Sequence, residues 1–195
     1  MYVIAGPSGS GKTKTMGPDL WQRQGIHYFN VDNRCGVLNG SMQGIPAAVR
    51  RQAQQECEQF VADHIATGVS FAVETTLRSD AALRQGQTAR AAGFTTRMVY
   101  FATDNPDRHV GRVQVRAATG LHSAPAAEIR EIYAASLARL PTAIAVFATV
   151  SCVDTAEYGA KGKPVAEFAD GRLQWCCPDP PAWLTAALAA SRPPK

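Results

Sequence analysis

The sequence feature that most limits the fold is a glycine-rich segment close to the N-terminus. Residues Gly6 to Thr13 have the spacing of a phosphate-binding loop, with Gly, four residues and then Gly-Lys-Thr. The short apolar run 2–5 comes before this segment, and a helical pattern starts at Lys12. Phosphate loops lie on such strand–loop–helix junctions, because the glycines turn backbone N–H groups towards phosphate oxygens at a helix N-terminus. The segment therefore predicts an α/β fold that binds a nucleoside triphosphate.

The residues of this loop have separate expected tasks. Lys12 is placed to reach the β- and γ-phosphates of ATP, and the hydroxyl of Thr13 is placed to ligate Mg²⁺. A glycine-rich turn without a nucleotide is the alternative, and the strand–helix context disfavours it. The sequence has no dinucleotide-binding fingerprint, which disfavours NAD as a cofactor. The residues expected to contact ATP are Gly6, Pro7, Ser8, Gly9, Ser10, Gly11, Lys12 and Thr13.

Apolar runs alternate with helical patterns along most of the chain. Strands are expected at 2–5, 28–31, 69–73, 97–102 and 144–153, and a hairpin at 164–175. Helices are expected from 12 onward with a break at Gly17-Pro18, and at 46–66, 79–92, 106–118, 125–140 and 181–190. The pattern predicts an α/β P-loop fold with a mainly parallel five-stranded sheet, helices on both faces, and a small C-terminal hairpin and helix. One domain is expected over residues 1–190, with residues 191–195 as a tail.

Composition limits the partners of the protein and its location. The 195 residues carry 20 Lys+Arg against 16 Asp+Glu, and this net charge of +4 is too small and dispersed to predict nucleic-acid binding. No apolar run reaches the ~18 residues needed to cross a bilayer, and no signal peptide is visible. The five cysteines match no zinc pattern. We therefore expect a cytoplasmic protein with free thiols and with neither a membrane nor a nucleic-acid partner.

Several acidic residues follow apolar strands, where ligands bind in open α/β sheets. Asp32 stands at the end of the second expected strand, and a carboxylate there can orient an acceptor hydroxyl and take its proton. Glu74 follows the third expected strand beside Thr75, and it can bind substrate hydroxyls or hold a water on Mg²⁺. Asp154 is expected near the nucleotide. The alternatives are that Asp32 caps a loop through its own backbone and that Glu74 forms a structural salt bridge.

Arg112 and Arg116 are four residues apart and share one face of an expected helix. Two guanidinium groups there can clamp a transferring phosphoryl group and stabilise the charge on its oxygens. A solvated basic face, with Asp104 and Asp107 at its acidic start, is the alternative. The sequence has neither the Asn-Lys-x-Asp of guanine recognition nor an apolar strand that ends in Asp-Glu, which disfavours a GTPase and a mechanical ATPase. The arrangement is typical of a small-molecule kinase.

Three segments, in this order, resemble the zeta toxin family of P-loop kinases. The first is 4–13, which contains the phosphate loop, and the second is 71–77, which is similar to the family's apolar-Glu-Thr-Thr-Leu strand end. The third begins at Arg112-Val113 and continues through Gly120-Leu-His-Ser-Ala-Pro125 into the helix at 129–140, similar to the family's Arg-Val…Arg…Gly-Gly-His-x-Val-Pro stretch. Asn30-Val-Asp32 also matches the family's Asn-x-Asp. The likeness covers residues 2 to 155.

The resemblance implies a kinase that uses ATP and Mg²⁺ and whose acceptor is a nucleotide sugar such as UDP-N-acetylglucosamine. It implies Lys12, Asp32, Arg112 and Arg116 as catalytic residues, and Asp32, Glu74, Thr75 and His122 as substrate-binding residues within reach of a lid at 105–125. It also implies a toxin–antitoxin context, in which a small antitoxin protein binds in trans. Two alternatives stay open: a metabolite kinase for a sugar acid, nucleoside or vitamin, and a regulatory ATP-binding protein that is not a kinase.

Overall fold

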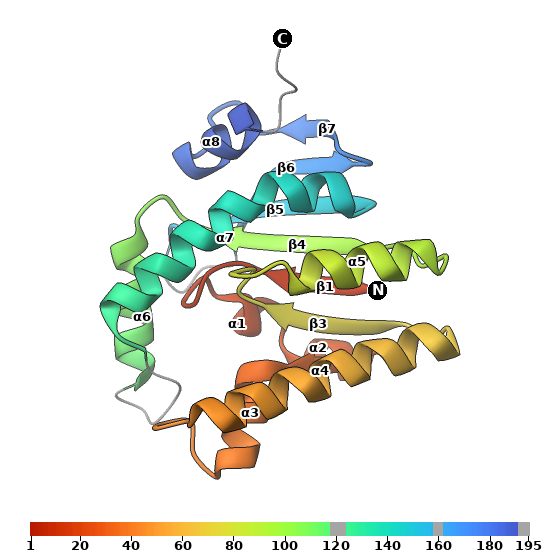
Figure 1. The fold of residues 1–195 in the computed structure, drawn as a ribbon. Helices are drawn as coiled ribbons and strands as arrows, with labels where there is room; N and C mark the ends of the chain where they lie inside the picture. The colour runs from red at the N-terminus through yellow and green to blue at the C-terminus, as the bar shows by residue number, and fades with distance from the viewer. Residues whose placement is uncertain (118–123, 158–161, 191–195) are drawn as a thin grey trace.

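One seven-stranded sheet forms the centre of the computed structural model, which describes residues 1–117, 124–157 and 162–190 (Figure 1). The strands are β1 (Tyr2–Ala5), β2 (His27–Asn30), β3 (Phe71–Thr75), β4 (Arg97–Ala102), β5 (Thr149–Asp154), β6 (Lys163–Ala169) and β7 (Arg172–Cys176). Their spatial order is β2-β3-β1-β4-β5-β6-β7. The pairs from β2 to β5 are parallel, whereas β6 and β7 continue the sheet as an antiparallel hairpin. The expected α/β fold is confirmed, and the hairpin raises the strand number from five to seven because β6 pairs with β5.

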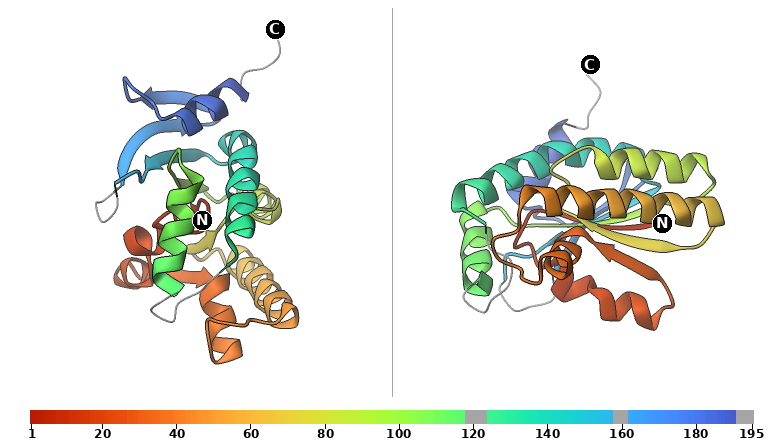
Figure 2. Two further views of the ribbon diagram at one scale, coloured as in Figure 1. Left: turned by 90° about the vertical axis from the view of Figure 1, so that its left-hand side faces the viewer. Right: turned by 60° about the horizontal axis from the view of Figure 1, so that its bottom comes forward.

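Helices cover both faces of this sheet (Figure 2). The helices are α1 (Lys12–Met16), α2 (Pro18–Arg23), α3 (Val31–Asn39), α4 (Ala47–Thr67), α5 (Ala81–Ala91), α6 (Pro106–Ala117), α7 (Ala126–Val146) and α8 (Ala182–Ala190). Side chains of α4, α5, α7 and α8 belong to the larger core on one face, and α2 contributes to a smaller core on the other. None of the described helices is both long enough and apolar enough to cross a membrane.

The two cores follow from the alternation of side chains along each strand. Val3 and Ala5 of β1 belong to the larger core, whereas Ile4 between them packs with Trp21 of α2 on the opposite face. Leu140 of α7 is fully buried in the larger core. This burial holds α7 against the sheet, and α7 in turn packs against α6, which borders the site described below.

Replacing Leu140 with alanine is expected to lower the free energy of unfolding by about 2–5 kcal/mol, because the deleted methyl groups leave a cavity in the core. Denaturant titration followed by far-UV circular dichroism measures this change. The matched control is Val115→Ala on α6, where the side chain is 60% exposed and the expected change is below about 0.5 kcal/mol. Similar losses in the two variants would contradict the assignment of the core.

The helix α7 is longer than the apolar pattern predicts. The sequence predicts a helix at 125–140 and a strand from 144, but α7 continues through Pro141 to Val146, and β5 begins at Thr149. Ala143 and Ile144 are buried within one turn of Leu140, so the apolar run continues the buried face of the helix. A short apolar run fits a buried helix as well as a strand, and periodicity alone does not separate the two. The strand prediction was wrong for residues 144–148.

A helix that the sequence pattern did not reveal begins directly after β2. The predicted strand at 28–31 ends at Asn30, and α3 begins at Val31. The Asn30 side chain accepts a hydrogen bond from the backbone N–H of Asn33 at 3.1 Å, which is the geometry of an N-cap. Asp32 therefore lies in the first turn of α3. The break at Gly17-Pro18 is confirmed, since α1 ends at Met16 and α2 begins at Pro18.

Candidate active site

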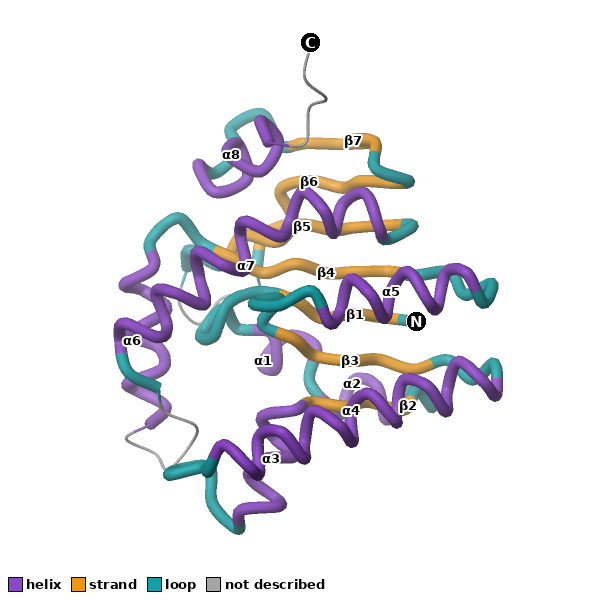
Figure 3. Tube along the Cα trace, viewed as in Figure 1, coloured by secondary structure: helices purple, strands orange, loops and turns teal. Residues whose placement is uncertain are grey.

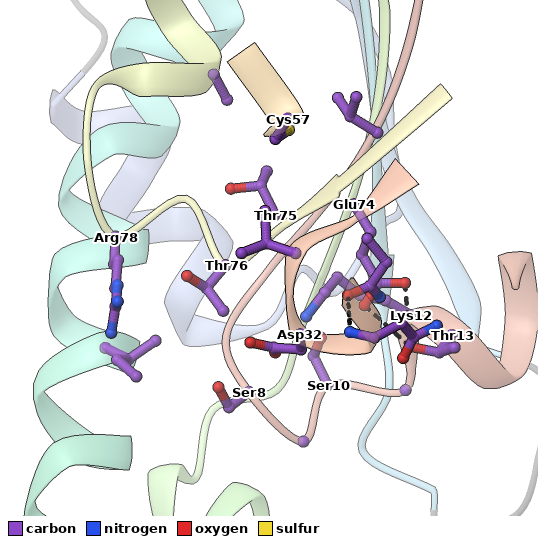
Figure 4. Close-up of a pocket in the computed structure, with 18 of the residues that line it drawn as sticks. Ser8, Ser10, Lys12, Thr13, Asp32, Cys57, Glu74, Thr75, Thr76 and Arg78 are labelled. Atoms are coloured by element: carbon purple, nitrogen blue, oxygen red, sulfur yellow. Dashed lines mark hydrogen bonds between the residues drawn. The ribbon is translucent and has the colours of Figure 1, made fainter. Parts of the chain in front are cut away.

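Figure 3 shows that β2, β3 and β1 end at the same edge of the sheet. A cavity of about 700 Å³ lies there, at the carboxyl ends of β2 and β3 and beside the loop that follows β1 (Figure 4). Its lining comes from that loop, from α3 and α4, from the end of β3 and the start of α5, and from α6. The strand order accounts for this position, because β2, β3 and β1 are neighbours and parallel, so the segments that follow them meet at one edge of the sheet.

The phosphate loop has a backbone conformation that depends on its glycines. Gly6 has φ 136° and Gly9 has φ 80°, values that other residues rarely adopt. A Cβ atom on Gly6 would lie 2.1 Å from the carbonyl oxygen of Phe101, and one on Gly9 would lie 2.7 Å from that of His109. The loop is therefore packed tightly between β4 and α6. Ser10 is fully buried, and its backbone N–H donates to the Pro7 carbonyl at 3.2 Å.

Lys12 begins α1 with its side chain buried inside this loop. Its Nζ donates hydrogen bonds to the carbonyl oxygens of Gly6 at 2.7 Å and Pro7 at 3.0 Å. Burial lowers the pKa of Lys12, while the negative charges of Glu74 and Asp32 act in the opposite direction. Arg116 lowers the pKa further. Lys12 and the two carboxylates therefore lie close enough together for their charges to interact.

Thr13 and Glu74 are joined directly, although 61 residues separate them in the chain. The Thr13 hydroxyl lies 2.9 Å from Oε1 and 3.0 Å from Oε2 of Glu74, and the Tyr28 hydroxyl donates to Oε2 at 2.7 Å. Burial, followed by the charge of Glu74, raises the pKa of Tyr28, so this hydroxyl stays a donor. Glu74 and Thr75 are the last residues of β3, two positions further than the predicted strand end. The sequence pattern did not indicate Tyr28.

The oxygen atoms of this group suit a hard divalent cation such as Mg²⁺, which prefers hydroxyl, carboxylate, phosphate and water oxygens. The Thr13 hydroxyl and the Glu74 carboxylate already lie together in this structure, and Asp32 lines the same cavity. Thr13 fits as the protein ligand of the ion that accompanies ATP, and Glu74 fits as the group that orients Thr13 or a coordinated water.

Glu74→Gln is expected to raise the Mg²⁺ concentration needed for half-maximal ATP turnover about 10-fold, because an outer carboxylate that orients a metal ligand is replaced by a neutral amide. A Mg²⁺ titration at saturating ATP measures the shift. Tyr28→Phe is the matched control, since it removes one hydrogen bond to Glu74 and keeps the charge. An unchanged Mg²⁺ requirement in Glu74→Gln would exclude this residue from the metal site.

Asp32 lines the cavity from the first turn of α3 (Figure 4). Its side chain is half-buried, and its negative charge partly offsets the effect of burial, which lowers the pKa of Lys12. Asp32 lies within α3 and not in a loop, and the N-cap of this helix is Asn30. This position leaves the Asp32 carboxylate as part of the cavity wall.

The arginines of α6 face both the cavity and the segment after β5. Arg112 and Arg116 both line the cavity. The Arg112 Nη2 donates to the carbonyl oxygen of Thr155 at 2.6 Å, and the Arg108 Nη1 donates to that of Ala156 at 2.6 Å. These bonds fasten α6 to the segment after β5. The predicted substrate-binding residue His122 and the other residues of 118–123 in the predicted lid lie outside the described residues.

Asp154 has a structural role that the sequence did not indicate. Its Oδ1 accepts a hydrogen bond from Nε1 of Trp183 at 3.2 Å, and its Oδ2 accepts one from the Ala156 N–H at 3.3 Å. The backbone N–H of Trp183 donates to Asp104 at 2.7 Å. Asp154 thus joins β5 to α8, and it is not among the residues that line the cavity.

The far side of the cavity contains residues that the motifs did not reveal. Arg50, Gln54 and Cys57 line it from one face of α4, and Arg78 and Arg84 line it from the loop after β3 and from α5. Arg78 also forms an ion pair with Glu128 of α7 at 3.6 Å. The sequence did contain one indication of the α4 residues: their spacings of four and three place the side chains on one face of a helix.

No family model matches the sequence, and no curated protein matches it. Among solved structures, the chain is similar to one from the PezAT chromosomal toxin–antitoxin system of Streptococcus pneumoniae, with TM-score 0.60, 17% identity, and coverage of 83% of this chain and 71% of that one. It is also similar to the AvrRxo1-ORF1:-ORF2 structure with ATP, with TM-score 0.69 and 15% identity. That match covers 97% of this chain but only 62% of the other chain, which is less than two thirds. It is similar to shikimate kinase from Acinetobacter baumannii in complex with shikimate, with TM-score 0.50, 14% identity, and coverage of 80% and 83%.

The fold of this chain is therefore similar to that of these solved structures, one of which is a shikimate kinase. The likeness to a toxin–antitoxin structure agrees with the resemblance to the zeta toxin family that the motifs indicated, and it confirms the fold which that resemblance implied.

Proposed function

We propose that the protein transfers the γ-phosphoryl group of ATP to a hydroxyl group of a small acceptor. The observation that carries this proposal is the meeting of Lys12, Thr13, Asp32 and Glu74 in one cavity at the carboxyl edge of the sheet. A protein that only binds ATP has no need of a second carboxylate beside the phosphate loop. A phosphotransferase needs one to prepare the acceptor.

Each residue then has a defined part in the transfer. Asp32 accepts the proton of the acceptor hydroxyl while the new oxygen–phosphorus bond forms and the bond to the β-phosphate oxygen breaks. Lys12 exchanges its hydrogen bonds to Gly6 and Pro7 for bonds to phosphate oxygens, and Arg116 and Arg112 stabilise the charge on the transferring group. When bound, Mg²⁺ held by Thr13 supplies charge neutralisation for the phosphates.

We propose a nucleotide sugar, such as a UDP-N-acetyl sugar, as the acceptor. The cavity, of about 700 Å³, extends well past the phosphate loop to the wall formed by α4 and α5. Arg50, Arg78 and Arg84 supply positive charge there, which suits a diphosphate. The resemblance to zeta toxins supports the same class of acceptor.

The toxin–antitoxin context of one structural neighbour supports an antitoxin partner in trans. The five free thiols fit a reducing compartment, so we propose that the protein is located in the cytoplasm.

A metabolite kinase is the second candidate. The same arginines would bind the carboxylate of a sugar acid, and the structural neighbour with bound shikimate supports an acceptor of that kind. The two candidates differ in the anion that the arginines of α4 and α5 recognise. They share the loop, Asp32 and Glu74.

Incubation with ATP, Mg²⁺ and a panel of acceptors tests the proposal. The panel contains UDP-N-acetyl sugars, nucleosides and sugar acids, and mass spectrometry detects the gain of one phosphate group. Phosphorylation of a UDP-N-acetyl sugar supports the first candidate, and phosphorylation of only a sugar acid or a nucleoside favours the second. ATP turnover that never depends on an acceptor would instead identify a regulatory ATP-binding protein.

A further inference from the structure

His109 lies between the phosphate loop and the arginine-bearing helix, and the reaction described above does not use it. Its side chain on α6 is 0% exposed. The Nδ1 atom lies 3.1 Å from the carbonyl oxygen of Ser8, which belongs to the phosphate loop. On its other side the ring packs against Tyr133 of α7, with the ring centroids 5.3 Å apart. The imidazole thus connects three segments that are far apart in the sequence.

The contacts determine which tautomer the ring adopts. The Ser8 carbonyl only accepts hydrogen bonds, so Nδ1 carries the hydrogen and donates it. Nε2 is buried and has no hydrogen-bond partner among the described residues. Burial, with the nearby positive charges of Arg112 and Lys12, lowers the pKa of His109 to about 4. The ring is therefore neutral at physiological pH and adds no third cation beside Lys12 and Arg112.

The same region shows direct packing between the loop backbone and α6. A Cβ on Gly9 would lie 3.2 Å from Cα of His109 and 3.2 Å from Cγ2 of Val113. Arg112 and Arg116 follow His109 at three and seven residues, so the three side chains lie towards one side of the helix. A change in the distance between the loop and α6 would move both arginines relative to the phosphates.

We infer that His109 is a positioning residue, which fixes the phosphate loop to α6 through the Nδ1–H···O bond to Ser8 and so sets the distance between Lys12 and the two arginines. This inference rests on the proposed phosphoryl transfer. The donor at Nδ1 is the feature on which this inference depends.

Two substitutions separate the hydrogen bond from the packing. His109→Asn keeps a donor at the place of Nδ1, because the Asn amide nitrogen occupies a similar position. His109→Leu fills a similar space without a donor. We expect His109→Leu to lower kcat about 10- to 100-fold, since small misplacements of catalytic groups have effects of this size. We expect KM for the acceptor to change less than about threefold, because the acceptor wall is formed by other residues. His109→Asn is expected to stay within about threefold of the unmodified protein in kcat.

Amide hydrogen exchange of residues 8–12 without ATP gives a second readout that does not need turnover. The loop amides are expected to exchange faster in His109→Leu and at the normal rate in His109→Asn. Tyr133→Phe is the control, because it keeps the ring against His109 and removes only the hydroxyl bonds to the carbonyls of Thr103 and Asp104. If Asn and Leu behave alike in both readouts, the inference is wrong. If the unmodified protein phosphorylates no acceptor, the proposed function fails, and the exchange rates still decide the role of His109.

Discussion

Replacing Asp32 with Asn is expected to lower acceptor-dependent ADP release about 10³-fold while ATP affinity stays within about threefold. General-base catalysis contributes 10²- to 10⁴-fold in enzymes, and the amide has nearly the same shape but cannot take the proton. The residue lies in the cavity wall with Lys12, outside the phosphate loop at residues 6–13 that we propose to bind ATP. Coupled ADP detection with and without acceptor measures turnover, and calorimetric titration measures ATP affinity.

Asp19→Asn is the matched control for this substitution. Asp19 is also a first-turn aspartate, in α2, and it is absent from the cavity lining. The control is expected to keep full turnover. Equal turnover in Asp32→Asn and in the unmodified protein would remove Asp32 from the mechanism. Parallel loss of turnover and ATP affinity would assign Asp32 to nucleotide binding.

Replacing Lys12 with Met is expected to abolish measurable transfer, with a loss of at least about 10²- to 10³-fold from the missing electrostatic contact alone. Lys12 is the loop cation whose Nζ lies 2.7 Å from the Gly6 carbonyl and would reach the β- and γ-phosphates. Met has a similar length and no charge. The same assay measures turnover, and ATP binding is expected to weaken as well because a phosphate contact is lost.

A thermal unfolding measurement separates the loss of a catalytic charge in Lys12→Met from misfolding of this variant. Burial lowers the pKa of Lys12, which means that keeping this side chain charged inside the folded protein costs desolvation free energy. Removing the charge therefore should not lower the midpoint of thermal unfolding in the absence of ATP. Lys163→Met at the exposed start of β6 is the control and should change neither turnover nor the unfolding midpoint. A large drop in the midpoint of Lys12→Met would attribute the lost activity to the fold.

The sequence allowed the prediction of those parts of the fold that depend on local chemistry. The phosphate loop was readable because its glycines are needed for a backbone that other residues do not adopt, and Pro18 had to end a helix. The parallel sheet followed from the alternation of strands and helices. The continuation of α7 past Pro141 was not readable, because burial against the sheet decides between strand and helix for residues such as Ile144.

Some residues of the candidate site could also be predicted from the sequence, and others could not. Lys12, Thr13, Asp32 and Glu74 were predicted as separate residues next to strand ends, and the structure brings them to one cavity. Tyr28 was not predicted, since its contact with Glu74 depends on the register that pairs Asn30 with Glu74 and places Tyr28 two residues before Asn30 along β2. Such a pairing is a property of the assembled sheet. The arginines of α4 and α5 were missed because helical spacing shows which side chains share a face, and not which part of the fold that face meets.

The position of β1 between β3 and β4 has a consequence for the synthesis of the protein. The strand that precedes the phosphate loop is synthesised before both of its neighbours, which lie at Phe71–Thr75 and Arg97–Ala102. β1 gains its first partner only with β3 and its second only with β4, and non-local pairing of this kind makes folding slow. Because Gly6 packs against the Phe101 carbonyl of β4, the phosphate loop is expected to reach its final conformation only after β4 has been made.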